Sequence, residues 1–227
     1  MYTPPDPSRT SLPDCPSKRC LAQYLLLGAF VCTSSSTLFG TGYPEIAKLR
    51  RQLAHFETLH RHVHRDADGR KIVGYGYLLD QPDARYRIAG ICADFDNIVR
   101  GTAELSEKQA ECLSTLEIAE GILACRRAAI DFDQLSDVRQ RALLHVCISV
   151  GPARFLELHR LHMAVKHRQF AVAARAMKQL PWFRRYPDRG KTIIKMVESG
   201  IDPPWLSGRT EWQGGRSPTV SVHHNQN

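Results

Sequence analysis

Apolar residues recur at helical spacing in several stretches of the chain, and this pattern predicts a mainly α-helical protein. Leu49, Leu53 and Phe56 follow one another at intervals of four and three, so they share one face of a short helix. Residues 110–127 carry a longer apolar face and predict a second helix. Residues 138–150 are apolar on nearly all sides, so we expect this helix to lie at the centre of the core.

Capping residues mark where several helices begin and end. Ser106 and Gln109 form a capping-box signature for the long helix, and Ser136 can cap the central one. Pro187 at the start and Gly200 at the end frame the last helix. This last helix covers residues 188–200, and further helical segments are expected over residues 88–99, 155–163 and 170–180.

One short region changes from helical to alternating periodicity. His60, His62 and His64 alternate with other residues, which predicts a strand. Asp66-Ala67-Asp68-Gly69 then predicts a turn that needs glycine at its close, before glycine-punctuated strand sequence. The expected fold class is therefore α+β, mainly α. We expect a small sheet-bearing lobe, joined by one long helix to a larger helical lobe, with a cleft between them.

Two carboxylates flank this strand. Glu57 precedes Asp66 by nine residues. Glu57 falls near the end of the first helix, beside its buried stripe, where partial desolvation favours the neutral form that suits a general acid. Asp66 falls at a strand end, in a wetter place where it stays ionised. One protonated and one ionised carboxyl group is the division of roles that glycosidic cleavage requires.

The chain here resembles the phage-type lysozymes, which are muramidases. That family's pattern is a catalytic Glu in a helix, eight residues, a catalytic Asp in a D-x-x-G turn, and a G-x-G run ending in two leucines. The pattern falls on Glu57, Asp66, Gly69, Gly74, Gly76, Leu78 and Leu79. The other landmarks are residues 105–110 for a connecting helix, residues 139–144 with Gly151 for a central helix, and residues 182–189 for a W-x(4)-P-x-R element. The resemblance spans about Leu49 to Trp205.

The resemblance implies a lysozyme-like two-lobed fold and hydrolysis of the β-1,4 bond after N-acetylmuramic acid in peptidoglycan. Glu57 would protonate the leaving oxygen, and Asp66 would activate water on the opposite face, an inverting course. Arg189 would pair with Glu57 from behind and keep it oriented. Trp182 would support the site from the core, and Tyr77 would line the cleft. Neither a cofactor nor a metal ion is expected.

Four positions depart from the family's pattern. Ile72 stands where a Thr usually holds the attacking water, and it places carbon where the hydroxyl should be. Tyr77 replaces a His, His145 replaces an Asn on the central helix, and Ser149 occupies the polar position two before Gly151. A protein that keeps both carboxylates but loses some of the polar side chains that position the attacking water could bind peptidoglycan with slow turnover or none. This binding function is the alternative to an active lysozyme.

Charge is distributed unevenly along the chain. The formal net charge is +8, and residues 154–195 hold eleven Lys or Arg against two acids, Glu157 and Asp188. We expect this segment to present a positive surface to an anionic partner such as a wall polymer or a membrane. An anionic-surface binder that uses the fold only as a scaffold is thus a third hypothesis. A specific nucleic-acid partner is not expected, and the expected state is a monomer.

The N-terminal region predicts export. Residues 1–17 contain five prolines and predict a disordered leader, while residues 18–40 combine a basic flank with an apolar run. This second segment resembles a secretory signal or a weak signal anchor, so we expect an exported or periplasmic protein, transiently anchored at the membrane. The competing interpretations are a core helix and a misassigned start codon. Residues 45–205 form the expected lysozyme domain, and residues 206–227 the expected flexible tail.

The seven cysteines indicate no metal site, because they form neither a C-x-x-C pair nor a Cys/His cluster with zinc spacing. Cys112 and Cys125 lie on one predicted helix, about 20 Å apart at 1.5 Å per residue, so they cannot bridge each other. Pairing elsewhere stays open at this point.

Overall fold

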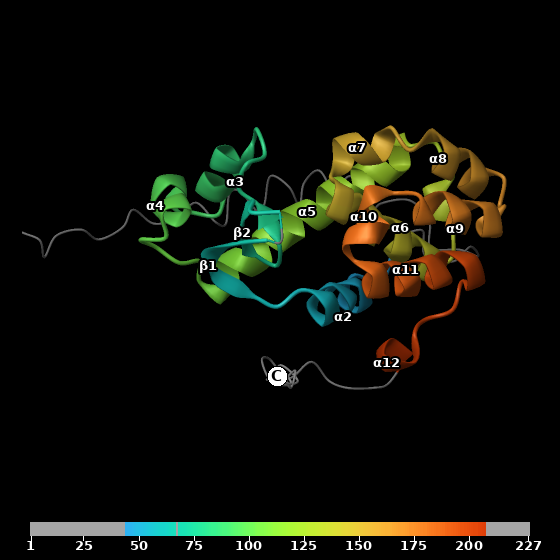
Figure 1. The fold of residues 1–227 in the computed structure, drawn as a ribbon, viewed down its shortest axis with the longest axis horizontal. Coiled ribbons are helices and arrows are strands. Elements are labelled where there is room, and N and C mark those ends of the chain that lie inside the picture. The colour runs from blue at the N-terminus through green and yellow to red at the C-terminus, as the bar shows by residue number, and fades with distance from the viewer. Residues whose placement is uncertain (1–43, 67, 208–227) are drawn as a thin grey trace, which may run out of the picture.

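The computed structural model describes residues 44–66 and 68–207, which fold into a mainly helical protein with one small antiparallel sheet (Figure 1). The expectation of an α+β, mainly α class is confirmed. Residues 1–43 lie outside the described part, and so do the expected leader and the segment at 18–40. Residues 208–227 of the expected tail lie outside it too.

The sheet-bearing region comes first in the chain. Its elements are β1 (His60–Arg65), β2 (Lys71–Gly74), β3 (Tyr77–Leu78), α3 (Ala84–Gly90) and α4 (Phe95–Arg100), and the chain reaches them through α2 (Ile46–Phe56), which packs on the helical region. The long helix α5 (Glu107–Arg127) follows. The helical region then comprises η2 (Phe132–Gln134), α6 (Asp137–Val150), α7 (Pro152–Leu156), α8 (His159–Lys166), α9 (Phe170–Lys178), α10 (Pro181–Arg185), α11 (Pro187–Ser199) and α12 (Pro204–Ser207).

The three strands pair in sequence order, β1–β2–β3, all antiparallel. Ile72 lies opposite His64 on one side and Leu78 on the other, and the β1–β2 pairing contains an irregularity between His60 and His64. The turn that joins β1 to β2 carries Asp66. The register of this hairpin therefore decides where the second candidate carboxylate lies.

Two separate hydrophobic cores underlie the two lobes, and α5 contributes to both. Val73, Ile88 and Leu105 belong to the core beneath the sheet, which Leu113 of α5 completes. The larger core gathers the helices that follow α5, together with α2. Ile118 of α5 belongs to this second core, so a single helix packs in both lobes. Figure 1 shows α5 running from one lobe to the other.

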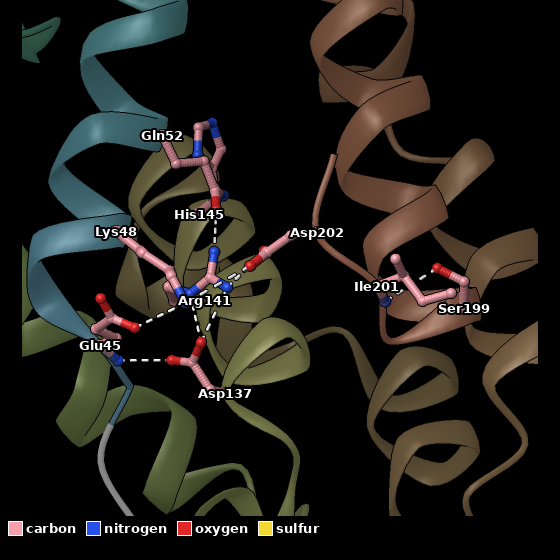
Figure 2. A network of polar contacts seen from close by, with 9 residues as sticks. All are labelled: Glu45, Lys48, Gln52, Asp137, Arg141, His145, Ser199, Ile201 and Asp202. Carbon is pink, nitrogen blue, oxygen red and sulfur yellow. Dashed lines mark hydrogen bonds and ion pairs between the residues drawn. The ribbon is translucent and has the colours of Figure 1, made fainter. Parts of the chain in front are cut away.

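A buried arginine fixes α2 against the helical lobe. The side chain of Arg141, on α6, is fully buried and pairs with Asp137 at 2.9 Å and Asp202 at 2.6 Å (Figure 2). Its Nη1 also donates to Oε1 of Gln52 on α2 at 3.1 Å. A buried guanidinium needs such partners because burying an unpaired charge is costly. The network therefore holds in place the helix that ends at Glu57.

Most of the expected boundaries are confirmed. Helix α5 ends at Arg127, and both hydrogen bonds of the Ser106–Gln109 capping box are present. Gly200 closes α11 in the left-handed conformation. The single segment expected over residues 88–99 is wrong, because Asp94 accepts a hydrogen bond from the Asn97 amide at 2.8 Å and thereby starts a new helix, α4.

The helix expected over residues 155–163 is also divided, into α7 and α8, with Leu158 in a non-helical conformation between them. Cys112 and Cys125 both carry free thiols, so neither forms the bond to a third cysteine that the sequence left open. In the part of the chain that the structure describes, no helix is both long and apolar enough to cross a bilayer.

Candidate active site

Glu57 lies at the C-terminal end of α2, where the helix stops and the chain turns extended. Its Oε1 lies 2.5 Å from Nη1 of Arg189, and Nη2 of the same arginine donates to the Phe56 carbonyl at 3.0 Å. The pairing that the resemblance implied is therefore present. One guanidinium holds both the carboxylate and the backbone before it, which limits the movement of the Glu57 side chain.

Arg189 is itself tightly enclosed. It lies in the first turn of α11 and is 8% exposed. Its guanidinium carbon sits 4.5 Å from the centre of the Tyr186 ring and 5.5 Å from that of Phe56. Such cation–π contacts, together with the two hydrogen-bonded partners, fix the plane of the guanidinium.

Gly76 forms the opposite wall beside Glu57. Its φ is +92°, a conformation that favours glycine, and a Cβ there would meet the Glu57 carboxyl carbon at 3.4 Å. The absence of a side chain lets the β2–β3 turn approach the carboxylate closely. Glu57 is thus enclosed between Arg189 of the helical lobe and Gly76 of the sheet lobe, while 28% of its side chain stays exposed.

Asp66 is held by a dense set of donors within its own turn. Its Oδ1 accepts from the backbone amides of Asp68 and Arg70, each at 2.9 Å. Its Oδ2 accepts from Nε of Arg70 at 2.8 Å and from Nη2 at 2.6 Å. A carboxylate offers about four lone-pair positions, so these four donors leave no free acceptor site.

The expected wet environment for Asp66 is wrong. Its side chain is 8% exposed, compared with 28% for Glu57, because the Arg70 side chain covers it. Burial alone would raise the pKa of Asp66, but hydrogen bonds from the side chain and amide of Arg70 and from the Asp68 amide outweigh burial and lower the pKa. The carboxyl group is therefore ionised, as expected, although for a different reason.

The α10–α11 junction brings the two candidate carboxylates to one region. Arg185, the last residue of α10, pairs with Asp68 in the Asp66 turn. Tyr186 lies within electrostatic reach of Arg70, and its ring also lies against the guanidinium of Arg189. The α10–α11 junction thus contacts Glu57 through Arg189 and the Asp66 turn through Arg185, and these contacts join the two lobes.

Tyr77 does not line a cleft, contrary to the expectation. It is 1% exposed, and its hydroxyl is buried with no hydrogen-bond partner among the described residues. It borders a cavity of about 20 Å³ together with Arg87 and Glu117. Burial raises the pKa of Tyr77, and burial reinforced by Glu120 raises the pKa of Glu117 to about 8 despite the nearby Arg87.

His145 is also fully buried, so it cannot contact a substrate directly and can only support the site. Because Arg141 donates to Oε1 of Gln52, the Gln52 amide nitrogen faces Nδ1 of His145 at 3.3 Å (Figure 2). That nitrogen donates, so Nδ1 accepts and the ring proton lies on Nε2. Burial first, and Arg189 second, lower the pKa of His145 to about 3.

The remaining expected residues occupy different environments. Trp182 is 5% exposed and belongs to the larger core. Ser149 lies near the end of α6 and is partly exposed. Ile72 is partly exposed on β2. Its neighbour Val73 pairs with Tyr77 of β3.

Sequence reasoning missed Arg70 and Arg185, which hold the Asp66 turn. An Asp and an Arg four residues apart around a glycine turn could have indicated the first pairing. Nothing in the local sequence indicates the second, because Arg185 and Asp68 are far apart in the chain. Within the described residues, no group of three His, Cys, Asp or Glu side chains is placed to hold a metal ion.

The sequence matches no protein-family model and no curated protein.

Proposed function

We propose that this protein is a muramidase, a glycoside hydrolase that cleaves the β-1,4 bond after N-acetylmuramic acid in peptidoglycan. The observation that carries the proposal is the pairing of Glu57 with Arg189 at 2.5 Å. The two residues stand far apart in the chain, at the positions where the resemblance to phage-type lysozymes puts a catalytic Glu and its orienting Arg. The fold's lysozyme-like character is part of the same proposal.

In this mechanism Glu57 donates a proton to the glycosidic oxygen as the bond from that oxygen to the sugar carbon breaks. A water molecule attacks the same carbon from the opposite face, and Asp66 accepts the proton that the water releases. The result is inversion at the sugar carbon. Arg189 orients Glu57 and stabilises its carboxylate after the proton has left.

The state of Asp66 sets a condition on this chemistry. A general base needs a free lone pair toward its water, whereas Arg70 occupies both remaining positions on Oδ2. Catalysis therefore requires Arg70 to withdraw when the glycan binds. Ile72 supplies no hydroxyl to hold the water. These two observations favour, as second candidate, a peptidoglycan-binding protein with weak or no turnover.

Release of reducing ends from purified peptidoglycan distinguishes the two candidates. The proposal expects release by the native chain and a loss of about 100-fold or more in Glu57→Gln, since general acid catalysis contributes roughly 10²–10⁴-fold. Sedimentation with peptidoglycan without product, equal for both proteins, would support the binding function instead.

Ile72→Thr tests the water-holding position directly. We expect this variant to release reducing ends faster than the native chain, because a hydroxyl returns to the place where the attacking water is held. Ile72→Val is the matched control, since it keeps the branched shape without the hydroxyl. A rate increase in both variants would show that side-chain volume, and not the hydroxyl, limits turnover.

A further inference from the structure

The hairpin formed by α8 and α9 has an unusual charge composition. Residues 159–179 contain five Lys or Arg and three His but no Asp or Glu. The hairpin lies at the end of the helical lobe away from the sheet (Figure 1), and none of the residues lining the groove beside it contacts Glu57 or Asp66. Whatever binds there does so outside the candidate active site.

Between the two helices lies an open groove of about 570 Å³. Arg160 and His159 of α8 border it on one side, and Arg175 of α9 borders it on the other. Met163 and Val172 also contribute to its lining. The groove therefore combines cationic and apolar side chains, contributed by both helices.

The cations of the hairpin are not neutralised within the protein. Arg160, Lys166, Arg168, Arg175 and Lys178 form no ion pair with any residue that the structure describes. By contrast, the arginines of the two lobes' interior are paired, as Arg141 and Arg189 illustrate. The hairpin thus presents uncompensated positive charge to the surroundings.

Two large apolar side chains are exposed in the middle of this charge. Met163 is 55% exposed and Val172 is 39% exposed. Cations around exposed apolar side chains are typical of surfaces that bind the interface of an anionic membrane. The groove lining contains no Phe, Tyr or Trp, the side chains on which nucleic-acid bases stack.

We propose that the α8–α9 groove docks the protein on a bilayer surface that contains anionic phospholipid. Arg160 and Arg175 face the headgroup phosphates, and Met163 and Val172 enter the boundary between headgroups and acyl chains. The proposal does not depend on muramidase activity. It concerns the described hairpin alone and would hold beside any contribution of the segment at 18–40.

Flotation of the full chain with vesicles tests this docking. The vesicles contain phosphatidylcholine alone or with about one-third phosphatidylglycerol. We expect binding to the anionic vesicles that weakens with added salt. Arg160→Glu with Arg175→Glu should weaken the partition constant about 30-fold or more, because each cation near an anionic surface contributes roughly 1 kcal/mol.

A second charge reversal serves as the matched control. Lys108→Glu with Arg127→Glu changes the net charge by the same amount on α5, where both side chains are exposed. This control keeps the whole N-terminal segment, so any contribution from residues 18–40 is common to all proteins tested. We expect its partition constant to stay within about threefold of the native value.

The apolar contribution is tested by Met163→Gln with Val172→Thr, which keeps every charge. We expect a several-fold loss of binding to anionic vesicles. Equal loss in the groove and control charge variants would overturn the proposal, and so would equal binding of the native chain to neutral and anionic vesicles. Retention on a DNA oligonucleotide with the same dependence on Arg160 and Arg175, but without dependence on Met163, would assign the groove to nucleic acid instead.

Discussion

Nη1 of Arg189 contacts Oε1 of Glu57 at 2.5 Å while Nη2 of the same side chain donates to the carbonyl of Phe56 at 3.0 Å. The start of α11 therefore determines where the end of α2 directs its carboxylate. A lysine at position 189 could not satisfy both oxygens with the same geometry, because it lacks the planar fork of the guanidinium.

Arg189→Lys should consequently lower peptidoglycan hydrolysis by about 100-fold through misplacement of Glu57. It should also destabilise the fold by roughly 2 kcal/mol, the usual size of a hydrogen bond to a charged group. Reducing-end release and urea unfolding measure the two effects. Arg127→Lys, at an exposed position, is the control and should change neither. Full activity in Arg189→Lys would contradict an orienting role.

Arg70→Ala should make the protein more sensitive to acid. The pKa of Asp66 is lowered in the folded protein, so its contribution to stability is fully present above the ordinary carboxyl pKa of 3.8 and is lost as the pH falls through the lower folded value. Without Arg70 the folded pKa rises, and the acid-unfolding midpoint moves to higher pH. Circular dichroism during acid titration measures the shift.

Arg85→Ala is the control for Arg70→Ala. Arg85 and Asp96 form a similar two-bond pair, but both side chains are largely exposed, so solvent screens the interaction. We expect little change in the midpoint for this variant. A shift as large as that of Arg70→Ala would mean that simple loss of one surface cation explains both.

Arg70→Ala has a second expected result on the proposed mechanism. Removing the side chain exposes two lone-pair positions on Oδ2 of Asp66, so the carboxylate can accept a proton from water without a prior movement. Reducing-end release near neutral pH should rise. A fall in rate with an unchanged fold would show instead that Arg70 orients Asp66 for the reaction.

Gly76→Ala tests the close approach of the sheet to Glu57. The backbone φ at this position is +92°, and an added Cβ would lie 3.4 Å from the Glu57 carboxyl carbon. Gly101→Ala is the matched control, since its φ of +76° is comparably unfavourable for alanine while its nearest neighbour is Val63 at 3.5 Å. Both variants should lose about 1 kcal/mol of stability from the left-handed backbone.

Only Gly76→Ala should additionally lose hydrolytic activity, because only there does the new methyl group lie in van der Waals contact with the Glu57 carboxylate and occupy the space beside it. Thermal unfolding and reducing-end release, measured on the same samples, separate the two effects. Equal activity in the two alanine variants would show that Gly76 serves the backbone turn and leaves Glu57 unaffected.

His145→Asn should reduce the pH dependence of stability. The pKa of His145 falls from 6.5 to about 3 in the fold, so between these values the unfolded chain binds a proton that the folded protein does not. Stability is therefore lost as the pH drops through this window, by about 1.4 kcal/mol per unit. Asn does not titrate, so the slope of unfolding free energy against pH should flatten there.

The measurement for His145→Asn is urea unfolding at several pH values between about 4 and 7, the part of the window accessible before general acid unfolding. His167→Asn provides the control, because His167 is exposed at the end of α8, and we expect the slope of the native chain in this variant. An unaltered slope in His145→Asn would mean that the buried imidazole is not the titrating group.

Local patterns along the chain determined the elements and the candidate chemistry. The apolar spacing of α2 located Glu57 at a helix end, and Ser106 with Gln109 marked the start of α5. These features depend on neighbours three or four residues away, so a single sequence contains them. The same local reasoning joined residues 88–99 into one helix, because it did not weigh the capping of α4 by Asp94.

Only the tertiary structure decided the surroundings of each candidate residue. Tyr77 was expected to line a cleft but is buried, and Asp66 was expected in water but is covered by Arg70. Burial and ion pairing depend on segments brought together from distant parts of the chain, as α2 and α11 are at Glu57 and Arg189. The sequence alone therefore determined which groups could react, while the packing of the two lobes decided which of them are exposed, paired or charged.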